Sequence, residues 1–131
     1  FADVTDEIGL EAPHAAGGGI TGQAWGDFDR DGDLDLFLSG GRADNQLLRN
    51  RGDGTFARVP LPPEVALPGP SKAGVTWADY DDDGWLDLYL AVLGPNVLYR
   101  NVPDDDGSGR TLVPVAAGVV HAPSPYCYRV N

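Results

Sequence analysis

The stretch GDFDRDGDLDLFLSG, residues 26–40, decides the fold expected for this chain. Aspartates occupy five alternate positions from Asp27 to Asp35, and an apolar segment follows directly. A second stretch, ADYDDDGWLDLYLAV at residues 78–92, repeats the pattern with changes. Carboxylates packed this tightly repel one another strongly when no cation lies among them. The pattern therefore indicates a bound cation in each copy.

Comparison of the chain with itself shows a repeat of about 52–56 residues. Residues 22–29 match 74–81 at an offset of 52, and residues 45–50 match 96–101 at an offset of 51. Repeats of this length are typical of propeller blades and solenoid turns. A short third element occurs at residues 1–4, 56–59 and 112–115.

Alternation of side chains along the chain predicts four short strands in each repeat. Leucines alternate with Asp35 and Phe37 over residues 34–38, and residues 86–90 follow the same period of two. Apolar residues on both sides of these strands indicate sheets packed on two faces. No stretch shows helical periodicity. The strands are expected at 22–28, 33–39, 45–50 and 55–59, and again at 74–80, 86–92, 96–101 and 111–115.

Four antiparallel strands per repeat predict an all-β fold made of β-propeller blades, about two of them, with an extra N-terminal outer strand. A ring needs about four to eight blades, so we expect the chain to be a fragment or a subunit. Further copies or protein partners would then complete the propeller and cover edges that are prone to aggregation. The predicted parts are an outer strand and connector (1–21), blade repeat 1 (22–60), a Pro-rich connector (61–73), blade repeat 2 (74–118) and a tail (119–131).

Composition limits the classes of partner. The 131 residues carry a net charge of −11, which argues against nucleic acid and anionic lipid. No run of about 18 apolar residues is present, so no membrane span is encoded. Cys127 is the only cysteine, and an intrachain disulfide is therefore impossible.

The spacing of the aspartates predicts two calcium sites. In the first loop positions 1, 3, 5, 7 and 9 are Asp27, Asp29, Asp31, Asp33 and Asp35. In the second loop positions 1, 3, 5 and 9 are Asp79, Asp81, Asp83 and Asp87, and position 7 is Trp85, which can offer its main-chain carbonyl. Calcium takes about six to eight oxygens, and a glycine at position 6 gives the sharp turn that directs alternate side chains inward. Magnesium fits less well because it demands a rigid octahedron.

The residues that flank these loops distinguish them from calcium-binding loops that lie next to helices. An EF-hand needs a bidentate glutamate at position 12 and helices on both sides. Position 12 is Leu38 or Leu90 here, and both flanks are predicted strands. Dockerin-type loops also lead into helices. EF-hand and dockerin loops are therefore excluded.

The segments WGDFDRDGDLDLF and NQLLRNRGDGTF resemble the FG-GAP/VCBS repeat family of calcium-binding β-propeller blades, found also in integrin alpha-subunit heads. The resemblance covers residues 1 to about 119. It implies that the calcium loop joins the first two strands of each blade, and that the protein is secreted, periplasmic or at the cell surface. The ligands that it implies are Asp27, Asp29, Asp31 and Asp35 in one loop and Asp79, Asp81, Asp83 and Asp87 in the other.

These observations favour an extracellular scaffold or protein-interaction module that performs no catalysis. A carbohydrate-binding or adhesive module is the alternative, with a glycan stacked on loop aromatics such as Trp85, Tyr99 and Tyr126. An accessory propeller of a larger enzyme is a further alternative. His14, His121 and Cys127 lie in connecting segments without the spacing of a catalytic or transition-metal site.

Overall fold

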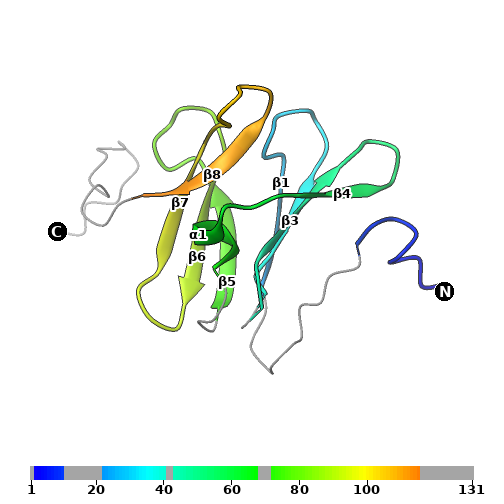
Figure 1. Ribbon diagram of the computed structural model, residues 1–131, viewed down its shortest axis with the longest axis horizontal. Helices are drawn as coiled ribbons and strands as arrows, with labels where there is room; N and C mark the ends of the chain where they lie inside the picture. The colour runs from blue at the N-terminus through cyan, green and yellow to red at the C-terminus, as the bar shows by residue number, and fades with distance from the viewer. Residues whose placement is uncertain (1, 11–21, 41–42, 68–71, 116–131) are drawn as a thin grey trace.

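The computed structural model describes residues 2–10, 22–40, 43–67 and 72–115 (Figure 1). Within these ranges the strands form two separate four-stranded sheets. The first sheet contains β1 (Gln23–Gly26), β2 (Asp35–Leu38), β3 (Gln46–Asn50) and β4 (Phe56–Val59). The second contains β5 (Lys72–Ala78), β6 (Asp87–Val92), β7 (Val97–Pro103) and β8 (Arg110–Pro114).

Each sheet is an antiparallel meander in which every strand pairs with the next one along the chain. The register repeats as well, because Trp25 pairs with Leu36 in the first sheet and Trp77 pairs with Leu88 in the second. The sheets lie side by side, with β1 next to β5 (Figure 1). The all-β prediction of four-stranded blades is thus confirmed, and the two blades do not close into a ring. Each strand begins and ends within two residues of its predicted range.

A short helix, α1 (Pro63–Ala66), lies in the connector, where no helix was predicted. The main-chain N–H groups of Val65 and Ala66 both donate to the carbonyl of Pro62. Leu67 then adopts a left-handed conformation, with φ of 43°, which ends the helix. A helix of four residues is too short to produce a hydrophobic periodicity, so the sequence pattern could not reveal it.

The predicted N-terminal outer strand is not present in residues 2–10. Residues 2–4 are not in a strand and residues 5–9 form turns, so this part of the prediction is wrong. The carbonyl of Ile8 nevertheless accepts a hydrogen bond from the N–H of Phe56 at 2.7 Å, at the start of β4. A strand needs a neighbour to pair with, and the segment contacts the edge strand of the first blade through a turn.

The hydrophobic core lies between the two sheets and includes Val65 of α1. Its buried members are Phe28, Phe37, Leu47, Val65, Leu88, Leu90, Tyr99 and Leu112. Trp77 of β5 packs against this core, and its indole Nε1–H donates to the carbonyl of Ala24 in β1 at 3.2 Å. Polar contacts add to the interface, because Asn101 Nδ2 donates to the Phe28 carbonyl at 2.8 Å. The two blades therefore share one core.

Packing on two faces is confirmed for the second and third strands of the first blade, since Leu47 and Leu48 of β3 are both 1% exposed. Leu36 and Phe37 of β2 point to opposite faces of the sheet, and both are buried. In β6, Leu88 and Leu90 are buried, whereas Tyr89 between them is 41% exposed. The second blade thus covers one face of the first blade, while the opposite face of the second blade remains open.

The contact between the blades requires a glycine at position 26. A Cβ atom at Gly26 would lie 2.7 Å from Trp77 Cδ1 and 3.0 Å from Leu86 Cδ1. We expect Gly26→Ala to lower the free energy of unfolding by about 1–3 kcal/mol, because the indole must shift within a packed core. Urea denaturation measures this change. Gly74→Ala in β5 is the control, since no atom lies within 4 Å of its added methyl group, and equal losses in the two variants would contradict the assignment.

Candidate metal centres

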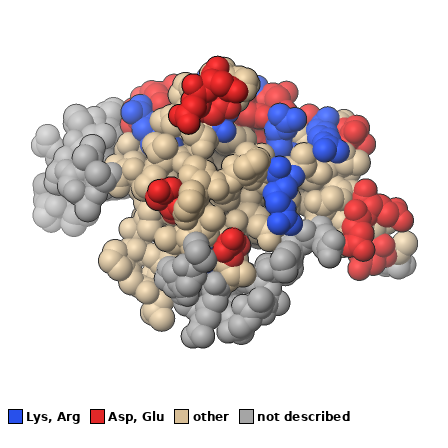
Figure 2. Space-filling view, in the orientation of Figure 1, with Lys and Arg blue, Asp and Glu red and all other residues tan. Residues whose placement is uncertain are grey.

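Both acidic loops join the first two strands of a blade and lie at the same end of the molecule (Figure 1). One loop connects β1 to β2 and the other connects β5 to β6. Acidic side chains gather along this end, with Lys and Arg side chains among them (Figure 2). The position of each loop within its blade is the one that the family resemblance implies.

The first aspartate of each loop holds the turn by accepting two main-chain hydrogen bonds. Asp27 accepts the N–H of Asp31 on Oδ1 and the N–H of Gly32 on Oδ2, both at 3.0 Å. Asp79 makes the same two bonds, to residues four and five positions further on, at 3.1 and 2.8 Å. The chain therefore wraps around this carboxylate in the same way in both repeats.

Two positions in each loop adopt left-handed backbone conformations. The glycines at position 6, Gly32 and Gly84, have φ of 97° and 86°, as the sequence pattern requires. Position 4 is left-handed too, with φ of 61° at Arg30 and 60° at Asp82. The left-handed conformation at position 4 was not predicted, because this position is Arg30 in one loop and Asp82 in the other, and neither is a glycine.

The ninth-position aspartates are buried and tie the loop to the third strand of its own blade. Asp35 Oδ2 accepts the N–H of Phe28 at 3.0 Å, and Oδ1 accepts the N–H of Asn50 at the end of β3 at 2.9 Å. Asp87 bonds the two equivalent main-chain groups at 3.2 and 2.8 Å. Each of these carboxylates thus links three parts of one blade: the start of the loop, the second strand and the third strand.

Burial and neighbouring charge change the acidity of several of these groups. Burial raises the pKa of Asp35 to about 6, although its two main-chain hydrogen bonds act in the opposite direction. Burial also raises the pKa of Asp87. For Asp29 the pKa is raised by burial and further by the charge of Asp31. Without a cation, these sites therefore resist full ionisation.

Three carboxylates converge in each loop, but the sets differ. Asp27, Asp29 and Asp35 converge in the first loop, and Asp79, Asp81 and Asp83 converge in the second, each offering one oxygen within 4.8 Å of the others. A calcium ion about 2.3–2.6 Å from each oxygen spans such separations. Among the described residues, Asp31, Asp33 and Asp87 lie outside these groups. Their roles as ligands, and that of the Trp85 carbonyl, stay predictions.

Arginines supply a positive charge to each loop. Arg100 of β7 lies 2.7 Å from Asp81 and 3.2 Å from Asp83, whereas Arg49 of β3 lies 4.0 Å from Asp29. Sequence reasoning gave these arginines no role. The repeated Arg-Asn pair at 49–50 and 100–101 was the available signal.

The donor set fits a hard divalent cation. Every converging group is a carboxylate, which is the ligand type that calcium prefers. Asp81 Oδ1 is buried and accepts no hydrogen bond, although Asp81 Oδ2 is paired with Arg100. A buried carboxylate oxygen without a donor is costly unless a cation meets it. The second loop thus has an oxygen available for a metal.

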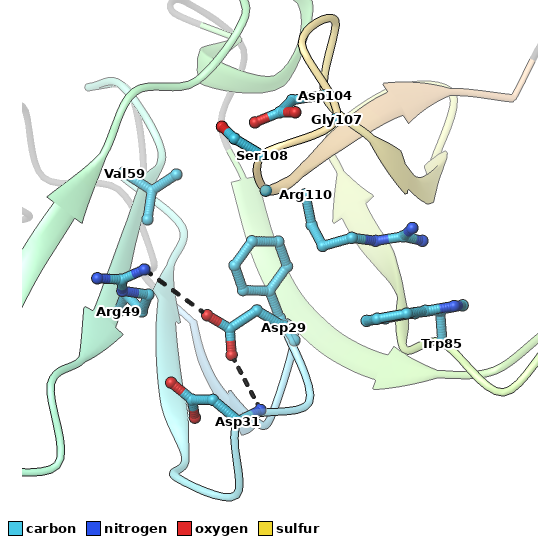
Figure 3. A pocket seen from close by; sticks show the side chains of 11 residues that line it. Asp29, Asp31, Arg49, Val59, Trp85, Asp104, Gly107, Ser108 and Arg110 are labelled. Carbon is cyan, nitrogen blue, oxygen red and sulfur yellow. Dashed lines mark hydrogen bonds and ion pairs between the residues drawn. The ribbon is translucent and has the colours of Figure 1, made fainter.

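A cleft of about 580 Å³ lies beside the first loop, between the two blades (Figure 3). Asp29 and Asp31 line one side, and Arg110 of β8 lies over the ring of Trp85 on the other, 3.8 Å from its centroid. The guanidinium of Arg30 is 5.1 Å from the same ring. The indole of Trp85 is therefore engaged in cation–π contacts within the chain.

The structure describes two of the three aromatic residues predicted to stack on a glycan, Tyr99 and Trp85. Tyr99 is fully buried, and its hydroxyl donates to the carbonyl of Glu64 at 2.9 Å, so its expected place on a binding surface is wrong. Trp85 already carries Arg110 on its ring. Tyr126, His14, His121 and Cys127 lie outside the described residues.

Comparison with family models gives a match that spans both acidic loops. A family model described as FG-GAP-like repeat matches residues 27–90, just under half of the chain. The match starts at the first aspartate of the first loop and ends within β6, so it includes both acidic loops. No curated protein matches the chain significantly. Among the described residues, the structure contains no helix with the length and apolar character of a membrane span.

In metal-free protein we expect the Asp35 carboxyl to titrate near pH 6, because burial favours its protonated form. The stability that depends on this group should fall as the pH rises from about 4 to about 6, since the folded state then binds more protons than the unfolded state. Calcium should move the pKa of Asp35 downward by favouring the charged form. Carboxyl ¹³C NMR measures both values.

Asp53 is the internal control for this titration. Its hydrogen bonds with Thr55 lower its pKa, and it lies in the β3–β4 turn outside both acidic loops. Its pKa should not respond to calcium. A normal titration of Asp35 near pH 4 in metal-free protein, or equal calcium responses at Asp35 and Asp53, would contradict this prediction.

Proposed function

We infer the function from the premise that this chain belongs, through residues 27–90, to the FG-GAP-like repeat family. Such repeats build β-propeller-like modules, and the family is generally calcium-binding and typically extracellular. We propose that the chain is a calcium-binding β-propeller module that binds one calcium ion in each blade. Its role is that of an extracellular scaffold or protein-interaction surface, without catalysis.

A single observation carries the calcium proposal: two loops, 52 residues apart, repeat the same carboxylate-centred fold. Each loop brings three carboxylate oxygens within 4.8 Å of one another. Two calcium ions would reduce the net charge of the chain from −11 to −7. The ions would act as structural clips that remove repulsion between the carboxylates of each loop.

The environment of Asp35 supports a non-catalytic role. Asp35 has the most clearly raised pKa of the loop carboxyls, but it is buried and both of its oxygens accept main-chain N–H groups. A substrate therefore has no route to this carboxyl. The extracellular placement is supported by the family match, because repeats of this family are typically extracellular.

Calcium stoichiometry tests the proposal. We expect native mass spectrometry to find two calcium ions in the unaltered chain and one in each of Asp29→Asn and Asp81→Asn, because each substitution removes a charge from one group of three. The double variant should bind none. Asp53→Asn, in the exposed β3–β4 turn, is the control and should keep two. Two ions in all variants, or a melting temperature that chelation leaves unchanged, would refute the calcium proposal.

The arginines predict a difference between the two loops. Arg100 pairs with two carboxylates of the second loop and competes with a cation there, so Arg100→Gln should strengthen calcium binding at that loop by a few-fold. This size follows from an exposed ion pair worth about 0.2–1 kcal/mol. Arg49→Gln is the matched control and should have a smaller effect, because Arg49 is 4.0 Å from Asp29. Calorimetric titration separates the two affinities. Weaker binding in Arg100→Gln would show that the arginine supports the site.

A further inference from the structure

The residues that form the contact between the two blades have equivalents, one repeat away, on the outer faces of both blades. Trp77 and Leu86 of the second blade insert into the face of the first. The Trp77 ring centroid lies 6.2 Å from that of Phe28 and 6.1 Å from that of Phe37. Both inserted side chains approach to within 3.0 Å of the position that a Cβ atom of Gly26 would take.

The equivalents of the inserted residues are exposed in the first blade. Trp25 and Leu34 occupy the same repeat positions as Trp77 and Leu86. They are 47% and 56% exposed, whereas Trp77 and Leu86 are only partly exposed. Trp25 rests edge-on against Phe56 of its own blade, at 6.1 Å between ring centroids. We call Trp25 and Leu34 the knob.

The equivalents of the receiving residues are open in the second blade. Phe28 and Phe37, which receive Trp77, are buried, but their counterparts Tyr80 and Tyr89 are not, and Tyr89 is 41% exposed. The remaining counterparts, of Ala24 and Gly26, are also exposed, while Ala24 and Gly26 are buried. We call this surface the socket; it consists of Thr76, Ala78, Tyr80 and Tyr89.

We propose that the knob of one chain seats in the socket of a second copy of the chain. Each copy carries both halves of an interface whose complete form is already present between its own blades. Because knob and socket lie on opposite ends of the two-blade unit, the contact is head-to-tail, and such contacts close into rings when their rotation allows.

Two features of the chain weaken this contact relative to the internal one. Ala78 stands where Gly26 stands in the first blade, so the socket is shallower by one methyl group. The net charge of −11 on each copy opposes association at low salt. Association is therefore expected at high protein concentration, and added salt should strengthen it by screening the repulsion.

Analytical ultracentrifugation of the full chain in calcium buffer at 0.15 M and 0.5 M salt tests the proposal. We expect species of two or more times 13.9 kDa whose share rises with protein concentration and with salt. Trp25→Ala should weaken association at least tenfold, because a buried tryptophan dominates many interfaces. Leu93→Ala removes an exposed leucine outside the knob and socket and should leave association unchanged. A monomer at all concentrations, or equal losses in both variants, would overturn the proposal.

A mixing experiment tests the direction of the contact. Trp25→Ala retains the socket, and Ala78→Glu retains the knob while placing a carboxylate where the indole would enter. Each variant alone should be monomeric, and an equimolar mixture should form a one-to-one dimer. A mixture that stays monomeric would overturn the head-to-tail contact. Circular dichroism confirms that both variants remain folded.

The inference rests on the propeller part of the proposed function and is independent of the calcium part. The number of bound calcium ions is therefore measured on the same samples by native mass spectrometry. Calcium binding by a strictly monomeric chain would leave the calcium proposal intact and remove the second-copy contact. Association of a chain that binds no calcium would support the contact with a second copy and refute the calcium proposal.

Discussion

The structure depends on a hydrogen-bonded carboxylate that is buried at the start of the second strand of each blade. Asp35 and Asp87 each accept main-chain N–H groups from the loop before them and from the third strand. An ionised carboxylate is costly to bury without such donors. The bonds therefore set where the loop must lie relative to the sheet, and the remaining aspartates are positioned as a consequence.

The two loops have the same main-chain conformation but different arrangements of charged side chains. The first aspartate bonds the same two amides in both, yet the converging carboxylates come from positions 1, 3 and 9 in one loop and positions 1, 3 and 5 in the other. Arg100 pairs with both Asp81 and Asp83, at 2.7 and 3.2 Å, whereas the ion pair of the first loop, between Arg49 and Asp29, is longer at 4.0 Å. The arginine thus acts as a partial counter-charge in the second blade.

The contact between the blades has a direction. One blade contributes a tryptophan and a leucine, and the other contributes a glycine backed by two phenylalanines. The same positions at the two ends of the unit are exposed, because a sheet with apolar residues on both faces needs a neighbour on each side. Within the described residues, the two blades meet this need on one side each, by packing against each other. The open knob and socket follow from this constraint.

The repeat, the strands and the composition of the loops follow from the amino-acid sequence alone. Alternating residues such as Leu36 and Phe37 specify strands because side chains on a strand point to opposite faces, and the glycine at position 6 specifies the turn. Only the tertiary structure decided which aspartates converge, that Arg100 pairs with the second loop, and that Tyr99 is buried. It also decided that residues 2–4 form no strand. These features depend on contacts between residues far apart in the chain, and local spacing carries no information about which distant group fills a given position.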